Sequence, residues 1–199
     1  MSGDQRVCFV GDSFVAGVGD PQALGWTGRL TAHARAAGAA WTTYNLGVRG
    51  HTSADIAARW SAECLVRLPP GSDGRVVFSF GVNDTVLAAG RPMVDAQNSV
   101  TNLSVLLTTA RAQAWPVLVV GPPPVAEAGH NRRIEELDGR FEQTCAEFGV
   151  AYAASFRLLG EDRVWREQVR AGDGAHPAAE GYAAFAERLL PTWRQWVGY

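Results

Sequence analysis

Short strand-like runs and helical patterns alternate five times along this chain, and this alternation limits the folds open to it. The runs are rich in β-branched residues, and most of them end at glycine or at a turn residue. Such alternation is typical of a parallel sheet with helices on both faces, so we predict an α/β fold. The predicted strands are Val7–Val10, Thr42–Leu46, Val76–Phe80, Val117–Val120 and Val150–Ala153.

The helical patterns between these strands carry start and stop signals. We predict Ser53 as the N-cap of the second helix and Pro92 as the first residue of the third. Pro191 should kink or break the last helix, because a proline inside a helix removes one backbone hydrogen bond. The helices are expected over Gly25–Ala37, after Ser53, from Pro92, over Ile134–Phe148 and from Pro177.

Length and composition indicate the class of protein. The 199 residues are 47% hydrophobic, which is enough for one full core, so we expect a single domain over residues 1–199. The formal net charge is −2 and no block of like charge reaches five residues, so nucleic-acid binding is not expected. No run approaches 18 apolar residues, so the sequence predicts no membrane span.

The first residues and the cysteines bear on the compartment. Residues 1–6 are polar and lack a basic segment followed by a long apolar stretch, so we expect no signal peptide. Cys8, Cys64 and Cys145 are far apart, and none forms a CxxC pair. We therefore predict reduced thiols in the core of a cytoplasmic protein.

Four short blocks of polar and glycine residues follow predicted strands or precede the last helix. Sites in open α/β sheets form at the carboxyl ends of the strands, so these blocks are expected to meet. The blocks are Gly11-Asp12-Ser13 after the first strand, Gly47 after the second, Gly81-Val82-Asn83-Asp84 after the third, and Asp173-Gly174-Ala175-His176-Pro177 before the last helix.

The residue types in these blocks suit nucleophilic catalysis. A serine hydroxyl such as that of Ser13 needs a base within hydrogen-bond reach, and the base needs a partner that orients it. Histidine suits the base role, and Asp173 lies three residues before His176, a spacing that can bring its carboxylate to one imidazole nitrogen. Acyl transfer also needs donors for the developing oxyanion, and the candidates are the backbone N–H groups of Ser13 and Gly47 and the side-chain amide of Asn83.

In all four blocks, in their order and over nearly the whole chain, the sequence resembles the SGNH hydrolases, also called the GDSL esterase/lipase family. The resemblance implies a flavodoxin-like, three-layer αβα sandwich with a five-stranded parallel sheet in the order 2-1-3-4-5. It also implies Ser13 as nucleophile, His176 as base with Asp173 as its partner, and Gly47 and Asn83 as oxyanion donors. The G-x-S-x-G elbow of the α/β-hydrolase fold is absent, because Val15 occupies its last position.

Several other residues have plainer expected roles. Asp12 is expected to accept backbone N–H groups at its turn, and Asp84 to be structural. His33 and His130 are expected on the surface, and His51 is a candidate for the rim of the site. Because the histidines do not share ligand spacing with each other or with a carboxylate, no metal site is predicted. Trp26 is a candidate for the pocket wall, beside Phe14, Val82 and Val125 near the acyl group.

We predict a hydrolase that cleaves esters or thioesters of small to medium acyl groups through an acyl-enzyme, without a cofactor. One alternative is an acyltransferase on the same scaffold, which would pass the acyl group to an alcohol instead of water. Another is a flavodoxin-like binding protein with a vestigial triad. Short chains are favoured because none of the loops that follow the strands reads as a mobile apolar lid, although the Phe156–Gly172 stretch could cover the cleft.

Overall fold

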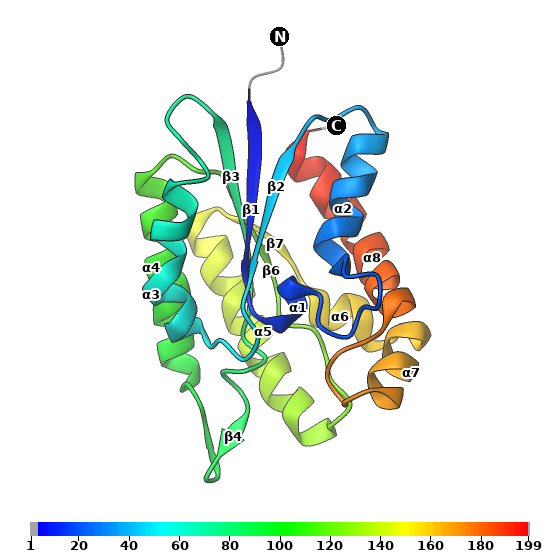
Figure 1. The fold of residues 1–199 in the computed structure, drawn as a ribbon. Coiled ribbons are helices and arrows are strands. Elements are labelled where there is room, and N and C mark those ends of the chain that lie inside the picture. The colour runs from blue at the N-terminus through cyan, green and yellow to red at the C-terminus, as the bar shows by residue number, and fades with distance from the viewer. Residues whose placement is uncertain (1–3, 199) are drawn as a thin grey trace.

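The predicted parallel sheet is present in the computed structural model, which describes residues 4–198 (Figure 1). Its five strands lie in the order β2-β1-β3-β6-β7, and every pair of neighbours is parallel. Counted along these five strands alone, this is the order 2-1-3-4-5, so the predicted fold class is confirmed. The strands are β1 Gln5–Gly11, β2 Thr42–Gly47, β3 Asp73–Ser79, β6 Val117–Val120 and β7 Ala151–Ala153. The expectation about a signal peptide falls partly on residues 1–3, which lie outside the described residues.

Helices cover both faces of this sheet and complete the three layers (Figure 1). One face is covered by α3 Ser53–Leu65, α4 Ala96–Ala112 and α5 Ala128–Phe148. The other is covered by α2 Gly25–Ala36 and α8 Ala179–Val197, together with the short helices α1 Ser13–Ala16, α6 Ser155–Gly160 and α7 Arg163–Ala171.

Alternating side chains of the central strand fill a core on each face of the sheet. In β1, Val7 and Phe9 belong to the core under α2 and α8, whereas Cys8 and Val10 belong to the core under α3, α4 and α5. This follows from the two-residue period of a strand, which sends successive side chains to opposite faces. Cys64 and Cys145 also lie in the second core, and all three cysteines are buried free thiols, as predicted.

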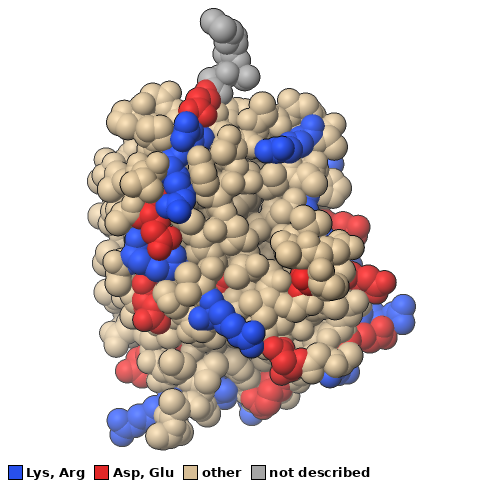
Figure 2. Space-filling model, viewed as in Figure 1, with Lys and Arg blue, Asp and Glu red and all other residues tan. Residues whose placement is uncertain are grey.

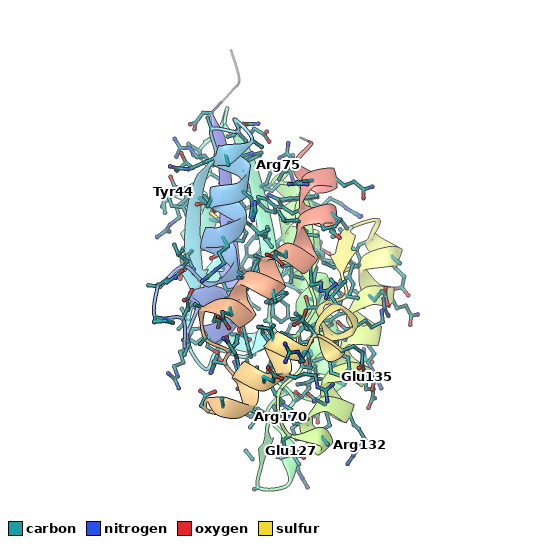
Figure 3. The ribbon with its side chains drawn as sticks, turned by 90° about the vertical axis from the view of Figure 1, so that its right-hand side faces the viewer. Tyr44, Arg75, Glu127, Arg132, Glu135 and Arg170 are labelled. Carbon is teal, nitrogen blue, oxygen red and sulfur yellow. The ribbon has the colours of Figure 1, made fainter. Side chains whose placement is uncertain are left out.

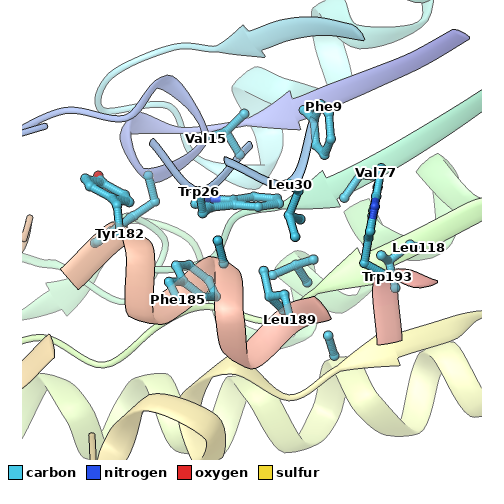
Figure 4. Close-up of a cluster of buried hydrophobic side chains, with 14 of the residues drawn as sticks. Phe9, Val15, Trp26, Leu30, Val77, Leu118, Tyr182, Phe185, Leu189 and Trp193 are labelled. Atoms are coloured by element: carbon cyan, nitrogen blue, oxygen red, sulfur yellow. The ribbon is translucent and has the colours of Figure 1, made fainter. Parts of the chain in front are cut away.

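Trp26 belongs to the first core and does not line the site. It is 0% exposed, and its ring lies 5.5 Å from that of Phe9 and 5.5 Å from that of Phe185, measured between centroids (Figure 4). The expectation that Trp26 forms a pocket wall is therefore wrong. The reason is that α2 turns this side chain toward the sheet, where α8 covers it.

The segment after β3 differs from the prediction. Pro92 does not begin a helix, because it lies in a small antiparallel hairpin formed by β4 Leu87–Ala88 and β5 Arg91–Pro92. Helix α4 begins at Ala96 instead, after Asp95 as its N-cap. In this hairpin, Pro92 pairs with Leu87, and the missing N–H of proline is tolerated because a position at a strand edge does not have to donate to a further strand.

Two other residues, at the start of α3 and inside α8, differ from the prediction. Thr52, and not Ser53, is the N-cap of α3, where its side chain and that of Asp55 accept each other's backbone N–H groups. Pro191 does not break the last helix, since α8 continues through it to Val197.

The Phe156–Gly172 stretch is not an open loop. It folds mostly into α6 and α7, and Leu159, Trp165 and Val169 are buried in the core with side chains of α8. This segment therefore belongs to the helical layer, anchored by its apolar residues.

The surface carries charges of both signs. Figure 2 shows arginines, the chain's basic residues, interspersed with Asp and Glu on the face it presents, without a broad area of one sign. Figure 3 shows Tyr44 and Arg75 toward the end of the sheet where β1 begins, and Glu127 and Arg170 toward the opposite end, where the strands finish. Along residues 4–198, no helix combines the length and the hydrophobicity needed to cross a lipid bilayer.

Candidate active site

Ser13 lies at the sharp turn where β1 ends and the short helix α1 begins. Asp12 is the N-cap of this helix, and its Oδ1 accepts the backbone N–H of Phe14 at 2.9 Å, as the sequence predicted. Ser13 is only 3% exposed, and its own backbone N–H makes no hydrogen bond within residues 4–198. The turn therefore fixes the hydroxyl and leaves one backbone donor unused beside it.

His176 lies next to this hydroxyl, although it comes from the segment before α8. Its Nε2 is 2.7 Å from Ser13 Oγ, and its Nδ1 is 2.7 Å from Asp173 Oδ2. The imidazole thus lies between the serine and the carboxylate, within hydrogen-bond distance of both. These are the three residues that the sequence singled out for nucleophilic chemistry.

Asp173 is held as a carboxylate. Burial raises its pKa, but hydrogen bonds outweigh burial, and the net pKa lies well below the ordinary value for an aspartate. The donors are the backbone N–H and the imidazole of His176 and the backbone N–H of Ala175. A charged Asp173 keeps the proton of His176 on Nδ1 and leaves Nε2 as an acceptor toward Ser13.

Aromatic packing fixes the orientation of the imidazole. The Phe14 ring lies 4.9 Å from the His176 ring and 6.2 Å from the Trp165 ring, measured between centroids. Trp165 is itself held by its indole N–H, which donates to the carbonyl of Pro124 at 2.9 Å. The first and last blocks of the sequence are thus joined by packing of the Phe14 and His176 rings as well as by the polar contact.

Asn83 lies after β3, beside the loop that follows β2. Its Nδ2 donates to the carbonyl of His51 at 2.9 Å, which fixes the orientation of the amide. The next residue, Asp84, accepts the backbone N–H of Ser53 at 2.7 Å and is fully buried. Asp84 therefore joins this turn to the start of α3, in agreement with the structural role expected for it.

Gly47 has a different environment from the one expected of an oxyanion donor. Its backbone N–H donates to Asn45 Oδ1 at 3.0 Å, and a Cβ at this position would lie 2.2 Å from the backbone nitrogen of Ala16. Glycine is needed here because β2 approaches α1 closely. Within the described chain, the N–H of Gly50, a residue with φ +80°, makes no hydrogen bond and belongs to the loop that Asn83 contacts. Gly50 is therefore a further glycine of this loop whose backbone donor is free, and no motif in the sequence distinguished it from Gly47.

The other histidines lie in three different settings. His33 is exposed on α2, as expected. His130 is not a solvated residue, because it is half-buried and its Nε2 lies 2.9 Å from Thr85 Oγ1 and 3.2 Å from the carbonyl of Val82. It therefore supports the turn that carries Asn83. His51 is half-buried beside Asn83, as an expected neighbour of the site.

Two carboxyl groups under the site are buried without a charged partner. Asp12 and Asp84 each have one side-chain oxygen with no hydrogen-bond partner among the described residues. Burial, together with the smaller effect of the nearby charge of Asp84, raises the pKa of Asp12 to about 7. Burial also raises the pKa of Asp84. No group of three His, Cys, Asp or Glu residues within 4–198 is arranged to hold a metal ion.

A surface hollow of about 540 Å³ opens beside the His176 imidazole. One wall comes from the loop after α1, with Val18 and Gly19, and the opposite wall from the end of α7 and the segment after it. Arg49, from the loop after β2, also lines the hollow. The hollow gives a small molecule access to the side of His176, while Ser13 is not among its lining residues.

Comparison with known proteins identifies the family. The profile of the GDSL-like lipase/acylhydrolase family matches residues 9–184. The crystal structure of TesA has a TM-score of 0.80 and 27% sequence identity, and the match covers 96% of this chain and 99% of that one. Among curated proteins, none matches this chain in sequence.

Two less similar structures share the fold. The lipase/acylhydrolase from Enterococcus faecalis has a TM-score of 0.77 and 22% identity, over 94% of each chain. Axe2, an acetylxylan esterase from Geobacillus stearothermophilus, has a TM-score of 0.78 and 18% identity, over 100% of this chain and 97% of that one. With its profile match and its fold, the chain belongs to the GDSL-like lipase/acylhydrolase family and is a carboxylic ester hydrolase.

Proposed function

We propose that the protein cleaves small-molecule esters through an acyl-enzyme on Ser13, with His176 as general base and Asp173 as its orienting partner. The observation that carries this proposal is the continuous line Asp173–His176–Ser13, with 2.7 Å at each contact. One domain that uses strands from the whole length of the chain would carry out the reaction, since β1 and the segment before α8 both supply residues to it.

In the first half of the reaction, Ser13 Oγ attacks the ester carbonyl carbon while His176 Nε2 takes the hydroxyl proton. The tetrahedral intermediate collapses, the bond to the alkoxy oxygen breaks, and His176 gives its proton to the departing alcohol. In the second half, His176 takes a proton from water, the hydroxide attacks the acyl carbon, and the proton returns to Ser13 Oγ as the acid leaves. Asp173 stays ionised throughout, because its hydrogen bonds hold its pKa low.

The oxyanion of the tetrahedral intermediate needs donors that point at it. The unused backbone N–H of Ser13 and the oriented amide of Asn83 support these two as donors. Gly47 was the third expected donor, but its N–H is already bonded to Asn45. We therefore assign the third donor role to the unbonded N–H of Gly50, and leave Gly47 the role of letting β2 pass close to α1.

The substrate class follows from the size and access of the hollow. A hollow of about 540 Å³ that is open to solvent suits a small or medium acyl or alkoxy group. Axe2, which shares the fold, is by name an esterase of acetyl groups on xylan. We propose esters or thioesters with short to medium acyl chains as substrates.

The experiment that tests the nucleophile is covalent trapping. The enzyme is incubated with a p-nitrophenyl alkylphosphonate, and the adduct is located by mass spectrometry of intact protein and peptides. One adduct on Ser13, with loss of p-nitrophenyl acetate hydrolysis, is expected. Ser13→Ala should form no adduct, while Ser104→Ala on α4, whose hydroxyl bonds only to the carbonyl of Val100, should behave like the wild type. An adduct on another residue, or hydrolysis retained by Ser13→Ala, would contradict the mechanism.

A further inference from the structure

The guanidinium of Arg59, on α3, lies against the ends of β1 and β2 and the loop after β2. Each of its three nitrogens makes a hydrogen bond. Nη2 donates to the carbonyl of Gly11 and to the carbonyl of Leu46, each at 2.9 Å. Nε donates to His51 Nδ1 at 3.1 Å, and Nη1 pairs with Glu63 at 2.9 Å. The side chain is 16% exposed, so most of this network is shielded from water.

The first two of these bonds join the carboxyl ends of neighbouring strands. Gly11 is the last residue of β1, two positions before the Ser13 nucleophile, and Leu46 is the next-to-last residue of β2. The carbonyl of Gly11 also accepts the backbone N–H of Val48, the first residue of the loop after β2. Arg59 thus ties the nucleophile turn to the base of the loop that carries Gly50 and His51.

The third bond reaches the residue that orients Asn83. Because His51 Nδ1 accepts from Arg59, the proton of the neutral imidazole is on Nε2, and the ring is held against the helix. The carbonyl of the same residue accepts the Asn83 amide at 2.9 Å. A continuous path of hydrogen bonds therefore runs from Arg59 through His51 to Asn83.

We propose that Arg59 is a positioning residue that sets the oxyanion donors in register with the nucleophile. This inference rests on the proposed function, since it needs Ser13 and Asn83 in their catalytic roles. Arg59 does not touch the substrate and acts through Gly11 and His51. Its planar fork serves three separate acceptors besides Glu63, and the single ammonium of a lysine cannot reproduce that geometry.

The first test separates positioning from folding. Arg59→Met and Arg59→Lys are compared with the wild type on p-nitrophenyl acetate, and kcat is expressed per active site after end-point titration with the alkylphosphonate. A misplacement of catalytic groups by about 1 Å costs about 10²-fold, so both variants should lose about 10–100-fold in kcat, with KM within about twofold. Glu63→Ala is the matched control, because it removes the half-buried carboxylate partner of Arg59 and leaves its other three bonds. Its kcat should be that of the wild type.

Because Arg59→Met can lower stability as well as activity, the melting temperature and the number of titratable active sites are measured beside kcat per site. A variant that only folds poorly would show fewer titratable sites with normal kcat per site, and that result would overturn the proposal. An equal loss in Glu63→Ala would also overturn it, because it would trace the effect to the ion pair on the helix surface.

The second test asks whether Arg59 acts through Asn83. A double-mutant cycle compares the decrease in log kcat that Arg59→Met causes in the wild type and in Asn83→Ala. In the Asn83→Ala background this decrease should be less than a third of that in the wild type, because the donor that Arg59 positions is already gone. Losses that simply add would contradict the path through His51. If Ser13→Ala remained active, the proposed function itself would fail. If Ser13→Ala were inactive and Arg59→Met fully active, only the role of Arg59 would fail.

Discussion

Ser13 Oγ lies 2.7 Å from His176 Nε2, although the two residues are 163 positions apart in the chain. The contact is possible because β1 ends at the same edge of the sheet where the segment before α8 crosses. Phe14, adjacent to the serine, packs on the imidazole and holds the two ends of the chain in this position. The Ser13–His176 contact therefore depends on the complete fold and cannot form in either half of the chain alone.

Asp173→Asn tests the carboxylate behind the histidine. The amide oxygen can still accept the backbone N–H groups of Ala175 and His176, so the loop should keep its shape. The amide NH₂, however, favours a proton on Nε2 of His176, where it cannot act as base toward Ser13. We expect kcat to fall by about 10³–10⁴-fold, measured on p-nitrophenyl acetate, with the melting temperature close to that of the wild type. Near-normal kcat in a folded Asp173→Asn would remove Asp173 from the mechanism.

Asn83→Ala tests the oxyanion donor. An amide that binds charge only in the transition state should affect kcat far more than KM, and the loss of one such donor costs about 10²–10³-fold in rate. Asn102→Ala is a suitable control on α4, because that amide donates to Ser53 Oγ and not to His51. A change confined to KM would assign Asn83 to substrate binding.

The sequence predicted the strands and the pairing of Asp173 with His176 because both depend on short-range signals. Strand residues alternate along the chain, and Asp173 and His176 lie within a single turn. The resemblance of the four blocks to one family then predicted that Ser13 lies beside Asp173 and His176. These features do not depend on which helix covers which face.

The errors arose where long-range packing decides the outcome. Trp26 reads as a pocket residue from its position after the first block, but α8 covers it. His130 is polar and begins a helix, yet the turn at Val82 draws it inward. No local pattern of residue types contains these contacts.

Asp12→Asn should change the pH dependence of stability. The folded protein keeps a proton on Asp12 up to about pH 7, because burial raises its pKa, whereas the unfolded chain releases it near the ordinary aspartate pKa of 3.8. Between these values the folded state binds more protons than the unfolded state, so this group makes the protein less stable as pH rises from about 4 to 7. Asparagine keeps an oxygen for the Phe14 N–H and has no proton to lose.

The measurement is urea unfolding of the wild type and Asp12→Asn at pH 5 and pH 8. The free energy of unfolding should fall between these pH values by about 2–3 kcal/mol more in the wild type than in the variant. Titration of other groups, such as Asp138, whose burial raises its pKa to about 6, is common to both proteins and largely cancels. An equal change in the two proteins would show that Asp12 is ionised in the folded state throughout this range.

The acyl-chain preference should peak at about two to eight carbons. Each methylene that leaves water contributes about 0.8 kcal/mol, but only where a wall receives it, so kcat/KM should rise with chain length and then stop rising once the chain leaves the hollow. The hollow beside His176 is lined by the end of α7 and by loop residues, and α7 is not free to extend it, because Trp165 and Val169 are buried against the core. Measuring kcat/KM on p-nitrophenyl esters from acetate to palmitate decides the matter. A maximum at about twelve carbons or more would mean that α6 and α7 move away from α8 to open a deeper channel, and the packing of Trp165 would then have to be weaker than its burial implies.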